Sequence, residues 1–508
     1  MTLIDTRRRG PAVTGARPMQ GVVGYACVAV ALVRLIYVWQ PLRPDEGGYL
    51  FAARHWRVGG EFLYGDFHVD RPPLLMAIFR VAALSDWDRA IRVLSIPFAL
   101  VAVVAVARAG YLLAGERGAR WSAVVAAALM SSPALAADQA DGELFAVPLV
   151  AASIALTLGA WRRPAGVARF RLAFAAGALA GAAPLVKQSF LEGLLFVGVL
   201  LIAESVRCRR VTPRCRELAA GAALGTLLPT LLVVVWARSA GVDALRLWTE
   251  LASFRGDAFA VIWQGSTRAP VRRGVLLVVL AVVSAMLPVA WTWVRACRER
   301  GSQRPSEEMA ISGGLLFGVA ALVAGGSYWP HYLLQSVPIL ALAAGMVAAR
   351  ESPVGAKMRR WSRIAAGSAV AAAVVTATVY AAVPSVWSHE RTGEWLARSS
   401  EPGDTVFVAY GTPSILEAAN LSTPYPYLWS LSMRTLDPRQ DRLRATLAAP
   451  DAPTWLVEVN GWNSWHIDRS GRLRSLIESR YDLVATVCGY KMWLRSDLPH
   501  ELTPSPSC

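Results

Sequence analysis

Acidic and basic side chains collect beside the long apolar stretches of this chain. Ionisable residues next to the hydrocarbon core of a membrane are costly, so they indicate a functional site by default. Carboxylates can take a proton from a hydroxyl as general bases, and cations can stabilise the charge of a leaving phosphate. The sequence therefore predicts a reaction on an anionic lipid, and the candidate residues are Asp45, Glu46, Asp70, Arg71, Asp138, Asp141, Glu143, Lys187, Arg255, His331 and Tyr332.

Each of these residues also has a purely structural explanation. Asp45 and Glu46 fit the start of a helix, where the helix dipole favours acids. Asp70 and Arg71 can form a local ion pair, and Lys187 can extend its ammonium group to the membrane interface. Their joint placement on one side of the membrane, opposite the arginine-rich loops, favours a shared site.

The composition is that of a membrane protein rather than a soluble enzyme. Of 508 residues, 55% are hydrophobic and 17% are charged, against roughly 25% charge in typical soluble proteins. The mean hydropathy is +0.39, which excludes a disordered chain. The net charge of +16 would suit a nucleic-acid binder, but the membrane topology explains it without a nucleic-acid partner.

Apolar runs of about 17–25 residues predict membrane-spanning helices. Such runs occur at 21–40, 90–114, 121–137, 144–160, 172–186, 189–205, 218–238, 273–294, 310–326, 332–349 and 364–383, so we expect about eleven spans. Arginines concentrate in the alternate loops 115–120, 161–171, 206–217, 295–308 and 350–363, which the positive-inside rule assigns to the cytoplasm. The basic segment 1–20 is then cytoplasmic, and an odd number of spans places the C-terminal part outside the membrane.

The candidate residues fall in the predicted outer loops of a transmembrane domain that covers 21–383. The first outer loop, 41–89, contains an apolar segment at 73–85 that is too short to cross the bilayer. We expect this segment to lie along the outer interface as a helix, because treating it as a span would place the arginine-rich loops outside. The other candidates follow in later outer turns and in the long loop 239–273.

Residues 384–508 have the composition of a small extracytoplasmic α/β domain. Runs at 405–410, 454–459 and 482–487 predict short strands, and 439–448 and 469–480 have helical spacing. Alternating strands and helices favour a three-layer unit. Cys488 and Cys508 lie in this domain, where both a disulfide and two free thiols fit the sequence. Trp455, Trp462 and Trp465 fit either sugar stacking or a packed core.

Several short motifs, taken in order and by their side of the membrane, resemble those of a known superfamily. They are Pro44-Asp45-Glu46, Asp70-Arg71-Pro72-Pro73-Leu74, Glu143-Leu144-Phe145-Ala146, Leu185-Val186-Lys187-Gln188 and His331-Tyr332-Leu333-Leu334-Gln335-Ser336-Val337-Pro338. The chain resembles the GT-C superfamily of polyprenyl-phosphate-sugar-dependent glycosyltransferases. Within that superfamily it is most similar to the family-39-like group, which includes protein mannosyltransferases and the lipid A aminoarabinose transferase.

The resemblance implies a role for each candidate residue. Asp45 would be the catalytic base, and Glu46 its supporting neighbour. The residues that bind the donor phosphate would be Arg71, Lys187, Arg255, His331 and Tyr332, and the supporting acids would be Asp70, Asp138, Asp141 and Glu143. We therefore expect an enzyme of the cell envelope that moves a hexosyl or pentosyl group from a polyprenyl-phosphate donor to an extracytoplasmic glycan, lipid or protein.

Two other functions are compatible with the sequence. A transporter usually carries polar residues near the membrane midplane and interrupted helix repeats, whereas the ionisable residues here lie at one surface. A non-catalytic envelope scaffold with an exported ligand-binding domain would have the same composition as the enzyme. The sequence contains no glycine-rich nucleotide motif. The sequence leaves the use of a divalent metal open: Asp45, Glu46 and Asp70 could bind Mg²⁺ or Mn²⁺ through oxygen.

Overall fold

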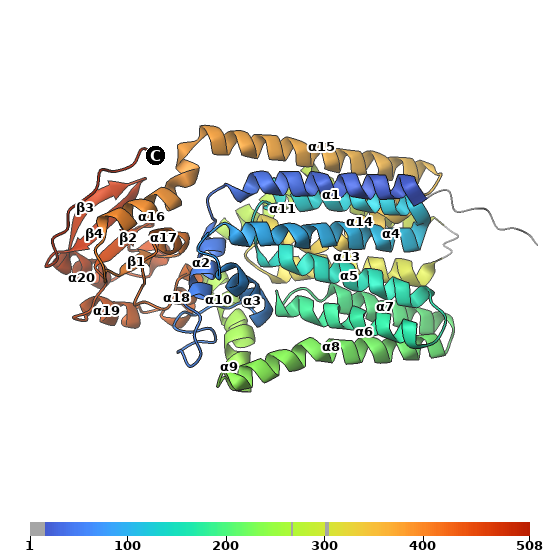
Figure 1. Cartoon of the computed structure of the whole chain (residues 1–508), viewed down its shortest axis with the longest axis horizontal. Helices are drawn as coiled ribbons and strands as arrows, with labels where there is room; N and C mark the ends of the chain where they lie inside the picture. Colours follow the sequence, from blue (N-terminus) through green and yellow to red (C-terminus); the bar gives the residue numbers. More distant parts are fainter. Residues whose placement is uncertain (1–15, 266–267, 300–303) are drawn as a thin grey trace, which may run out of the picture.

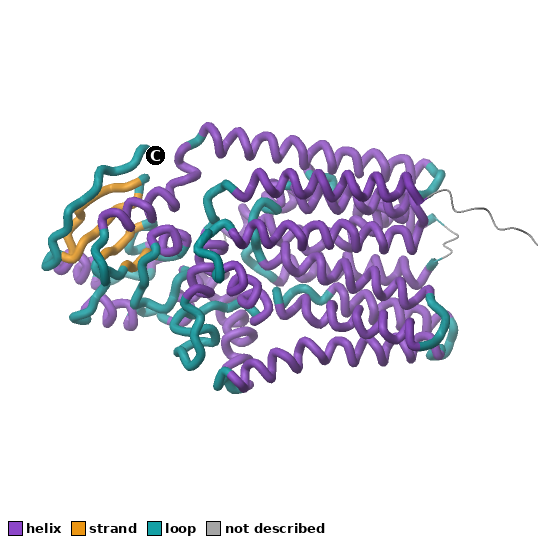
Figure 2. Tube along the Cα trace, in the orientation of Figure 1, coloured by secondary structure: helices purple, strands orange, loops and turns teal. Residues whose placement is uncertain are grey.

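The computed structural model describes residues 16–265, 268–299 and 304–508 as a long helical bundle with a smaller mixed domain at one end (Figure 1). The strands are confined to that smaller domain, which we call the C-terminal domain (Figure 2). The two parts are joined by α15 (Pro353–Ala382), which runs along the bundle. We call the end of the bundle that carries the C-terminal domain the docked end.

Long apolar helices build the bundle. They are α1 (Ala16–Val38), α4 (Ala90–Ser131), α5 (Gly142–Arg162), α6 (Val167–Ala182), α7 (Glu192–Arg207), α8 (Pro213–Ser239), α11 (Arg268–Val283), α12 (Met286–Arg298), α13 (Pro305–Ala324), α14 (Val337–Ala348) and α15. Within the described ranges, seven helices are long and apolar enough to cross a membrane, or eight if α11 and α12, bent by 67°, count as one span. Leucine and valine side chains along α8 and α15 are exposed, as expected of helices that face lipid.

The helix α4 consists of two antiparallel arms joined by a tight turn. Its backbone leaves the helical region at Ala114 and Gly115, and Gly115 has a φ of 64°, which glycine adopts readily. The arms then pack closely, because a Cβ on Gly110 would lie 2.8 Å from the Gly118 carbonyl oxygen. With two passes from α4 and one from α11 and α12, each predicted span corresponds to a helical segment. The predicted loop 115–120 shrinks to this turn.

Short helices cover the docked end of the bundle. They are α2 (Pro44–Arg54), α3 (Pro73–Ala82), η1 (Pro133–Leu135), η2 (Ala183–Leu185), α9 (Ala244–Trp248), η3 (Thr249–Ser253), α10 (Phe254–Gly265) and η4 (Pro330–Ser336). Both α2 and α3 begin at a proline, which is pre-organised for the first helical position. The segment predicted as an interfacial helix forms α3, and the predicted loop 239–273 is largely helical.

The C-terminal domain contains a four-stranded sheet in the order β1 (Val406–Ala409), β2 (Trp455–Glu458), β4 (Tyr490–Arg495) and β3 (Tyr481–Val487). β1 and β2 are parallel, whereas β4 is antiparallel to both of its neighbours. The sequence predicts three of these strands and misses β4. Its apolar run is only three residues long, between Lys491 and Arg495.

Helices cover both faces of the sheet, as a three-layer unit requires. The face that bears Val406 and Trp455 packs with apolar residues of α16 (Ser388–Ser399) and α17 (Ser414–Ala419). The face that bears Phe407 and Leu456 packs with α19 (Asp441–Ala448) and α20 (Arg472–Arg480). The remaining short helices of the domain are η5 (Pro384–Trp387), α18 (Ser430–Leu436) and η6 (Ser464–His466).

Two alternatives that the sequence leaves open are resolved in this domain. Cys488, in the β3–β4 hairpin, forms a disulfide with Cys508. Trp455 and Trp462 are buried, at 0% and 5% exposure, whereas Trp465 is 43% exposed. The rings of Trp455 and Trp462 belong to the core, so they are not accessible for stacking on a sugar.

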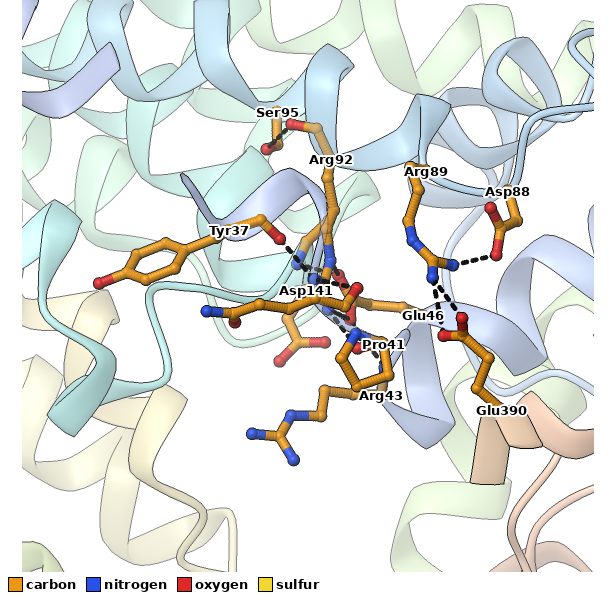
Figure 3. A network of polar contacts seen from close by, with 12 residues as sticks. Tyr37, Pro41, Arg43, Glu46, Asp88, Arg89, Arg92, Ser95, Asp141 and Glu390 are labelled. Atoms are coloured by element: carbon orange, nitrogen blue, oxygen red, sulfur yellow. Dashed lines mark hydrogen bonds and ion pairs between the residues drawn. The ribbon is translucent and has the colours of Figure 1, made fainter. Parts of the chain in front are cut away.

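The C-terminal domain is docked on the short helices through both apolar and charged contacts. Its α17 packs against α2, and its α18 packs against α10. Arg54 of α2 donates to Glu417 of α17 at 2.7 Å. Arg89, just before α4, donates two hydrogen bonds of 2.7 Å to Glu390 of α16 (Figure 3). These contacts hold the domain over the docked end of the bundle.

Candidate functional site

The structure brings the candidate residues together at the docked end. They come from the beginnings of α2 and α5, from the turns before α3, α5 and α7, and from α10 and η4. Each of these segments ends or begins a helix at the same end of the bundle (Figure 1). The C-terminal domain covers this cluster, so the site is built from both parts of the chain.

Glu46 joins α2 to α4 instead of facing a cavity. Its buried carboxylate accepts two hydrogen bonds from Arg92, at 2.8 and 2.6 Å (Figure 3). The backbone N–H groups of Arg43 and Ala140 donate to the same carboxylate at 2.9 and 2.8 Å. Burial alone would raise the pKa of Glu46, but Arg92 and these donors lower it;. The resemblance implies that Glu46 is the supporting neighbour of the catalytic base, and these four hydrogen bonds show how it is held.

Asp45, the preceding residue, faces the C-terminal domain. Trp429 Nε1 donates to Asp45 Oδ1 at 2.9 Å, and the Trp429 ring lies 5.1 Å from the ring of Tyr49. Within the described part of the chain, Asp45 Oδ2 accepts no hydrogen bond, and the residue is partly exposed. Its second oxygen is therefore free to approach the hydroxyl of a substrate.

Asp70 lies between two guanidinium groups. Its carboxylate is 2.9 Å from Arg71 Nη1 and 3.1 Å from Arg255 Nη2. Burial alone would raise the pKa of Asp70, but the charges of Arg255 and Arg71 lower it to about 2;. The Arg71 guanidinium also lies over the ring of Tyr49, 5.3 Å from its centroid. Asp70 therefore stays ionised and holds both arginines on one wall of the site.

Lys187 and His331 converge on Glu143. Lys187 Nζ donates to Glu143 Oε1 and lies over the ring of Tyr332, 4.6 Å from its centroid. His331 Nε2 is 3.7 Å from the same carboxylate oxygen, and His331 Nδ1 is 3.2 Å from Asp141 Oδ2. Burial lowers the pKa of Lys187, while Glu143 opposes that shift;. The ammonium group is thus oriented by a carboxylate and an aromatic face.

Asp138 and Asp141 lie in the buried turn before α5, at 3% and 4% exposure. Burial raises the pKa of Asp138. For Asp141, burial together with the charges of Asp45 and Glu143 raises the pKa well above its usual range;. Among the described residues, neither oxygen of Asp141 accepts a hydrogen bond of good geometry, although Oδ2 lies 3.2 Å from His331 Nδ1. Asp141 is therefore the acid of this cluster that most readily holds a proton.

A cavity of about 330 Å³ opens beside the cations. One part of its wall is polar and contains Arg71, Lys187, Gln188, Arg255 and Gln335. The other part is apolar, and its residues from α10 and α13 include Phe259, Ile262, Ala321, Leu322 and Ala324. Leu431 of the C-terminal domain completes the lining. The cavity therefore joins three cations to an apolar surface.

Two residues that the sequence does not single out are central to this arrangement. Arg92 lies in the first turn of a predicted span, and an ionisable side chain at that depth is a signal that could have identified it. Trp429 is one of 19 tryptophans, and no local pattern distinguishes it. Its role becomes visible only when the C-terminal domain is placed on α2.

The carboxylates proposed as metal ligands do not fit a divalent cation. Asp70 is paired with two arginines and Glu46 with Arg92, whereas Mg²⁺ and Mn²⁺ need available oxygen ligands. Across the described residues, no group of three His, Cys, Asp or Glu side chains is placed to hold a metal ion. The set of Asp45, Glu46 and Asp70 therefore does not fit a metal ion as these side chains are paired here, and the dependence of the protein on a divalent metal stays a prediction.

Two solved structures share this architecture over nearly the whole chain. ArnT from Cupriavidus metallidurans, bound to undecaprenyl phosphate, aligns with 95% of this chain and 98% of its own, with a TM-score of 0.61 and 16% identity. The Archaeoglobus fulgidus oligosaccharyltransferase, tethered with an acceptor peptide, aligns with 96% of this chain and 75% of its own, with a TM-score of 0.53 and 12% identity. The chain has the GT-C fold.

The chain is a multi-pass membrane protein with a small C-terminal sheet domain. The fold thereby confirms the resemblance that the motifs indicate. No protein-family model and no curated protein matches the sequence. At 16% and 12% identity the relationship is one of fold, so the chemistry has to be argued from the site.

Proposed function

We propose that this protein transfers a sugar from a polyprenyl-phosphate donor to an acceptor outside the cytoplasm. The observation that carries the proposal is the cavity, whose cationic and apolar walls match the phosphate and isoprenoid parts of such a donor. ArnT, which shares the fold, is bound to undecaprenyl phosphate in its structure, and this supports the same class of ligand here.

In the proposed reaction, Arg71, Lys187 and Arg255 bind the donor phosphate. Cations that are fixed before the reaction stabilise developing charge without having to reorganise. Asp70 fixes the two arginines, and Glu143 fixes the lysine. Three cations against two carboxylates leave this wall positive, as the binding of a phosphate requires.

Asp45 is the proposed general base. Its free Oδ2 atom takes the proton of an acceptor hydroxyl, and the hydroxyl oxygen attacks the anomeric carbon of the donor sugar. The bond between that carbon and the phosphate oxygen breaks, and its electron pair stays on the phosphate. Polyprenyl phosphate then leaves, and attack from the opposite face inverts the configuration of the sugar.

The other candidate residues support these groups. Glu46 holds the first turn of α2, and with it Asp45, against α4. His331 lies between Glu143 and Asp141, and Asp138 belongs to the same buried turn as Asp141. Tyr332 provides the aromatic face under Lys187. These residues shape the electrostatics of the site without contacting the acceptor.

The proposal also gives the chain an orientation, with the N-terminal segment in the cytoplasm and the C-terminal domain outside. The arginine-rich turn before α8 and the beginning of α15, which carries Arg359, Arg360 and Arg363, lie at the end of the bundle opposite the C-terminal domain (Figure 1), in agreement with the positive-inside rule. The Cys488–Cys508 disulfide supports the same orientation, because disulfides persist in oxidising compartments.

A transfer assay in liposomes tests the proposal, with radiolabelled polyprenyl-phosphate sugars offered one at a time. We expect the wild-type protein to release polyprenyl phosphate from one donor, and Asp45→Asn to lose at least about a hundredfold in turnover. Asp66→Asn is the matched control, because Asp66 makes an exposed ion pair with Arg57 in the same loop region. It should keep wild-type turnover.

Three results would contradict the proposal. Full turnover by Asp45→Asn would show that Asp45 is not the base. Movement of a labelled lipid across the bilayer by the wild-type protein, without release of polyprenyl phosphate, would indicate a transporter. A wild-type protein that binds none of the donors would indicate a scaffold.

A further inference from the structure

The C-terminal domain reaches into the proposed active site through one short segment, residues 427–434. Trp429 in this segment donates a hydrogen bond of 2.9 Å to Asp45 Oδ1. Two residues later, Leu431 lines the cavity that contains the three cations. Arg434 ties the segment to the bundle by donating to the carbonyl oxygen of Val261 at 3.0 Å. The same segment therefore contacts the base and the donor cavity.

The indole of Trp429 is held in place by close packing on α2. A Cβ on Gly48 would lie 2.5 Å from Trp429 Cζ2 and 2.5 Å from Pro413 Cγ. A Cβ on Gly47 would lie 2.6 Å from the Cα of Ser414. The two glycines thus let the C-terminal domain approach the backbone of the helix that carries Asp45. The indole N–H consequently has a fixed position relative to the carboxylate.

A carboxylate needs such a partner if one particular oxygen is to act as the base. The terminal torsion of an aspartate is broad, so both oxygens of a free side chain sample many orientations. A hydrogen bond from a rigid donor to Oδ1 restricts that torsion, and hydrogen bonds to ionised groups are among the strong ones. Preorganisation of a reacting group in this way raises the rate of the chemical step.

We propose that Trp429 is a positioning residue for Asp45, so that the C-terminal domain completes the active site. Trp429 binds Oδ1 and leaves Oδ2 directed at the acceptor hydroxyl. This inference rests on the proposed function of Asp45 as the base. It assigns to the C-terminal domain a part in the chemical step, and it predicts that the domain affects turnover more than donor binding.

Two variants at position 429 test the inference in the liposome transfer assay. Trp429→Phe keeps a ring against Tyr49 but lacks the indole N–H. Replacement of Trp429 by 3-benzothienylalanine keeps the fused ring and removes only the N–H donor. For both variants we expect kcat to fall about ten- to a hundredfold, as for the loss of a hydrogen bond to a charged group. The donor KM should stay within about twofold, because the cations of the cavity are intact.

Trp493→Phe is the matched control. Trp493 lies in the same domain, and its Nε1 donates to Glu458 Oε2 at 3.1 Å, so this variant also removes an indole-to-carboxylate hydrogen bond. It should keep the wild-type kcat. All three variants should elute as the wild-type protein does in size-exclusion chromatography, which shows that they are folded.

Several outcomes would overturn the inference. A wild-type kcat in both position-429 variants, or in the benzothienylalanine variant alone, would show that the N–H donor is not needed. A raised donor KM with unchanged kcat would make Trp429 a wall of the binding site. In each case wild-type transfer shows that the proposed function itself stands. Absence of transfer by the wild-type protein would overturn both.

Discussion

Arg92 Nη2 and Nε donate to the two oxygens of Glu46 at 2.6 and 2.8 Å, and both side chains are buried, at 2% and 0% exposure. The guanidinium group also donates to the carbonyl oxygens of Tyr37, Gln40 and Pro41. This pair ties the first turn of α4 to the first turn of α2 and to the end of α1. Asp45 is therefore held by Arg92 through its neighbour and by Trp429 directly.

Glu46→Gln should strongly destabilise the bundle, because it leaves the buried charge of Arg92 without a counter-ion. Breaking a buried ion pair in this way costs about 3–5 kcal/mol. Glu351→Gln is the control, since Glu351 and its partner Arg117 are 78% and 61% exposed and exposed pairs contribute little. The melting temperature in detergent measures both variants. Equal melting temperatures would mean that the Arg92–Glu46 pair does not hold α2 in place.

Arg255→Gln should weaken the binding of undecaprenyl phosphate about ten- to a hundredfold, as expected for one lost charge-assisted hydrogen bond. The matched control is Arg246→Gln, because Arg246 pairs with Glu250 at 3.1 Å and does not line the cavity. Calorimetric titration with undecaprenyl phosphate in detergent gives the two Kd values. An unchanged Kd for Arg255→Gln would remove this arginine from the phosphate site.

Donor binding should weaken as the pH rises, and it should begin to do so below the usual lysine value of 10.5. Burial lowers the pKa of Lys187 below this value, so its ammonium group loses its proton as the pH rises through the lowered pKa. The Kd for undecaprenyl phosphate should therefore rise with pH, and titrations between about pH 7 and 10.5 measure this rise. Lys187→Arg keeps its charge over that range and should show no such decline; a parallel decline in both proteins would point to another group.

Gly48→Ala should push the C-terminal domain away from α2, because the added Cβ would lie 2.5 Å from both Trp429 and Pro413. We expect a lower kcat and faster limited proteolysis at the domain junction. Gly198→Ala serves as the comparison, since a Cβ there meets nothing within 4 Å and alanine favours a helix over glycine. If both variants behave as wild type, the domain does not depend on this close approach.

The Cys488–Cys508 disulfide predicts which thiols react with an alkylating agent. In denaturant without a reductant, the labelled residues should be the free cysteines Cys27, Cys208, Cys215 and Cys297. Cys508→Ser should add Cys488 to that set and lower the stability of the C-terminal domain by about 3 kcal/mol. Labelling of all six cysteines in the wild-type protein would place this domain in a reducing compartment.

Much of this architecture is determined by local properties of the sequence. The length of an apolar run and the side on which arginines collect depend on neighbouring residues alone, so the spans, the α3 segment and the end that carries the candidate site could be predicted. The same holds for strands β1, β2 and β3, each of which contains at least three consecutive apolar residues. Strand β4 was not predicted; basic residues, Lys491 and Arg495, stand on both sides of its three apolar residues.

Only the tertiary structure decided how these residues are paired. Glu46 and Arg92 are 46 residues apart, and Asp45 and Trp429 are 384 residues apart. Such contacts depend on how whole helices and domains pack against one another, which no spacing along the chain encodes. For that reason the sequence points to Asp45 and Glu46 as neighbours in one site, whereas only the fold shows that one oxygen of Asp45 is free and that Glu46 is enclosed in four hydrogen bonds.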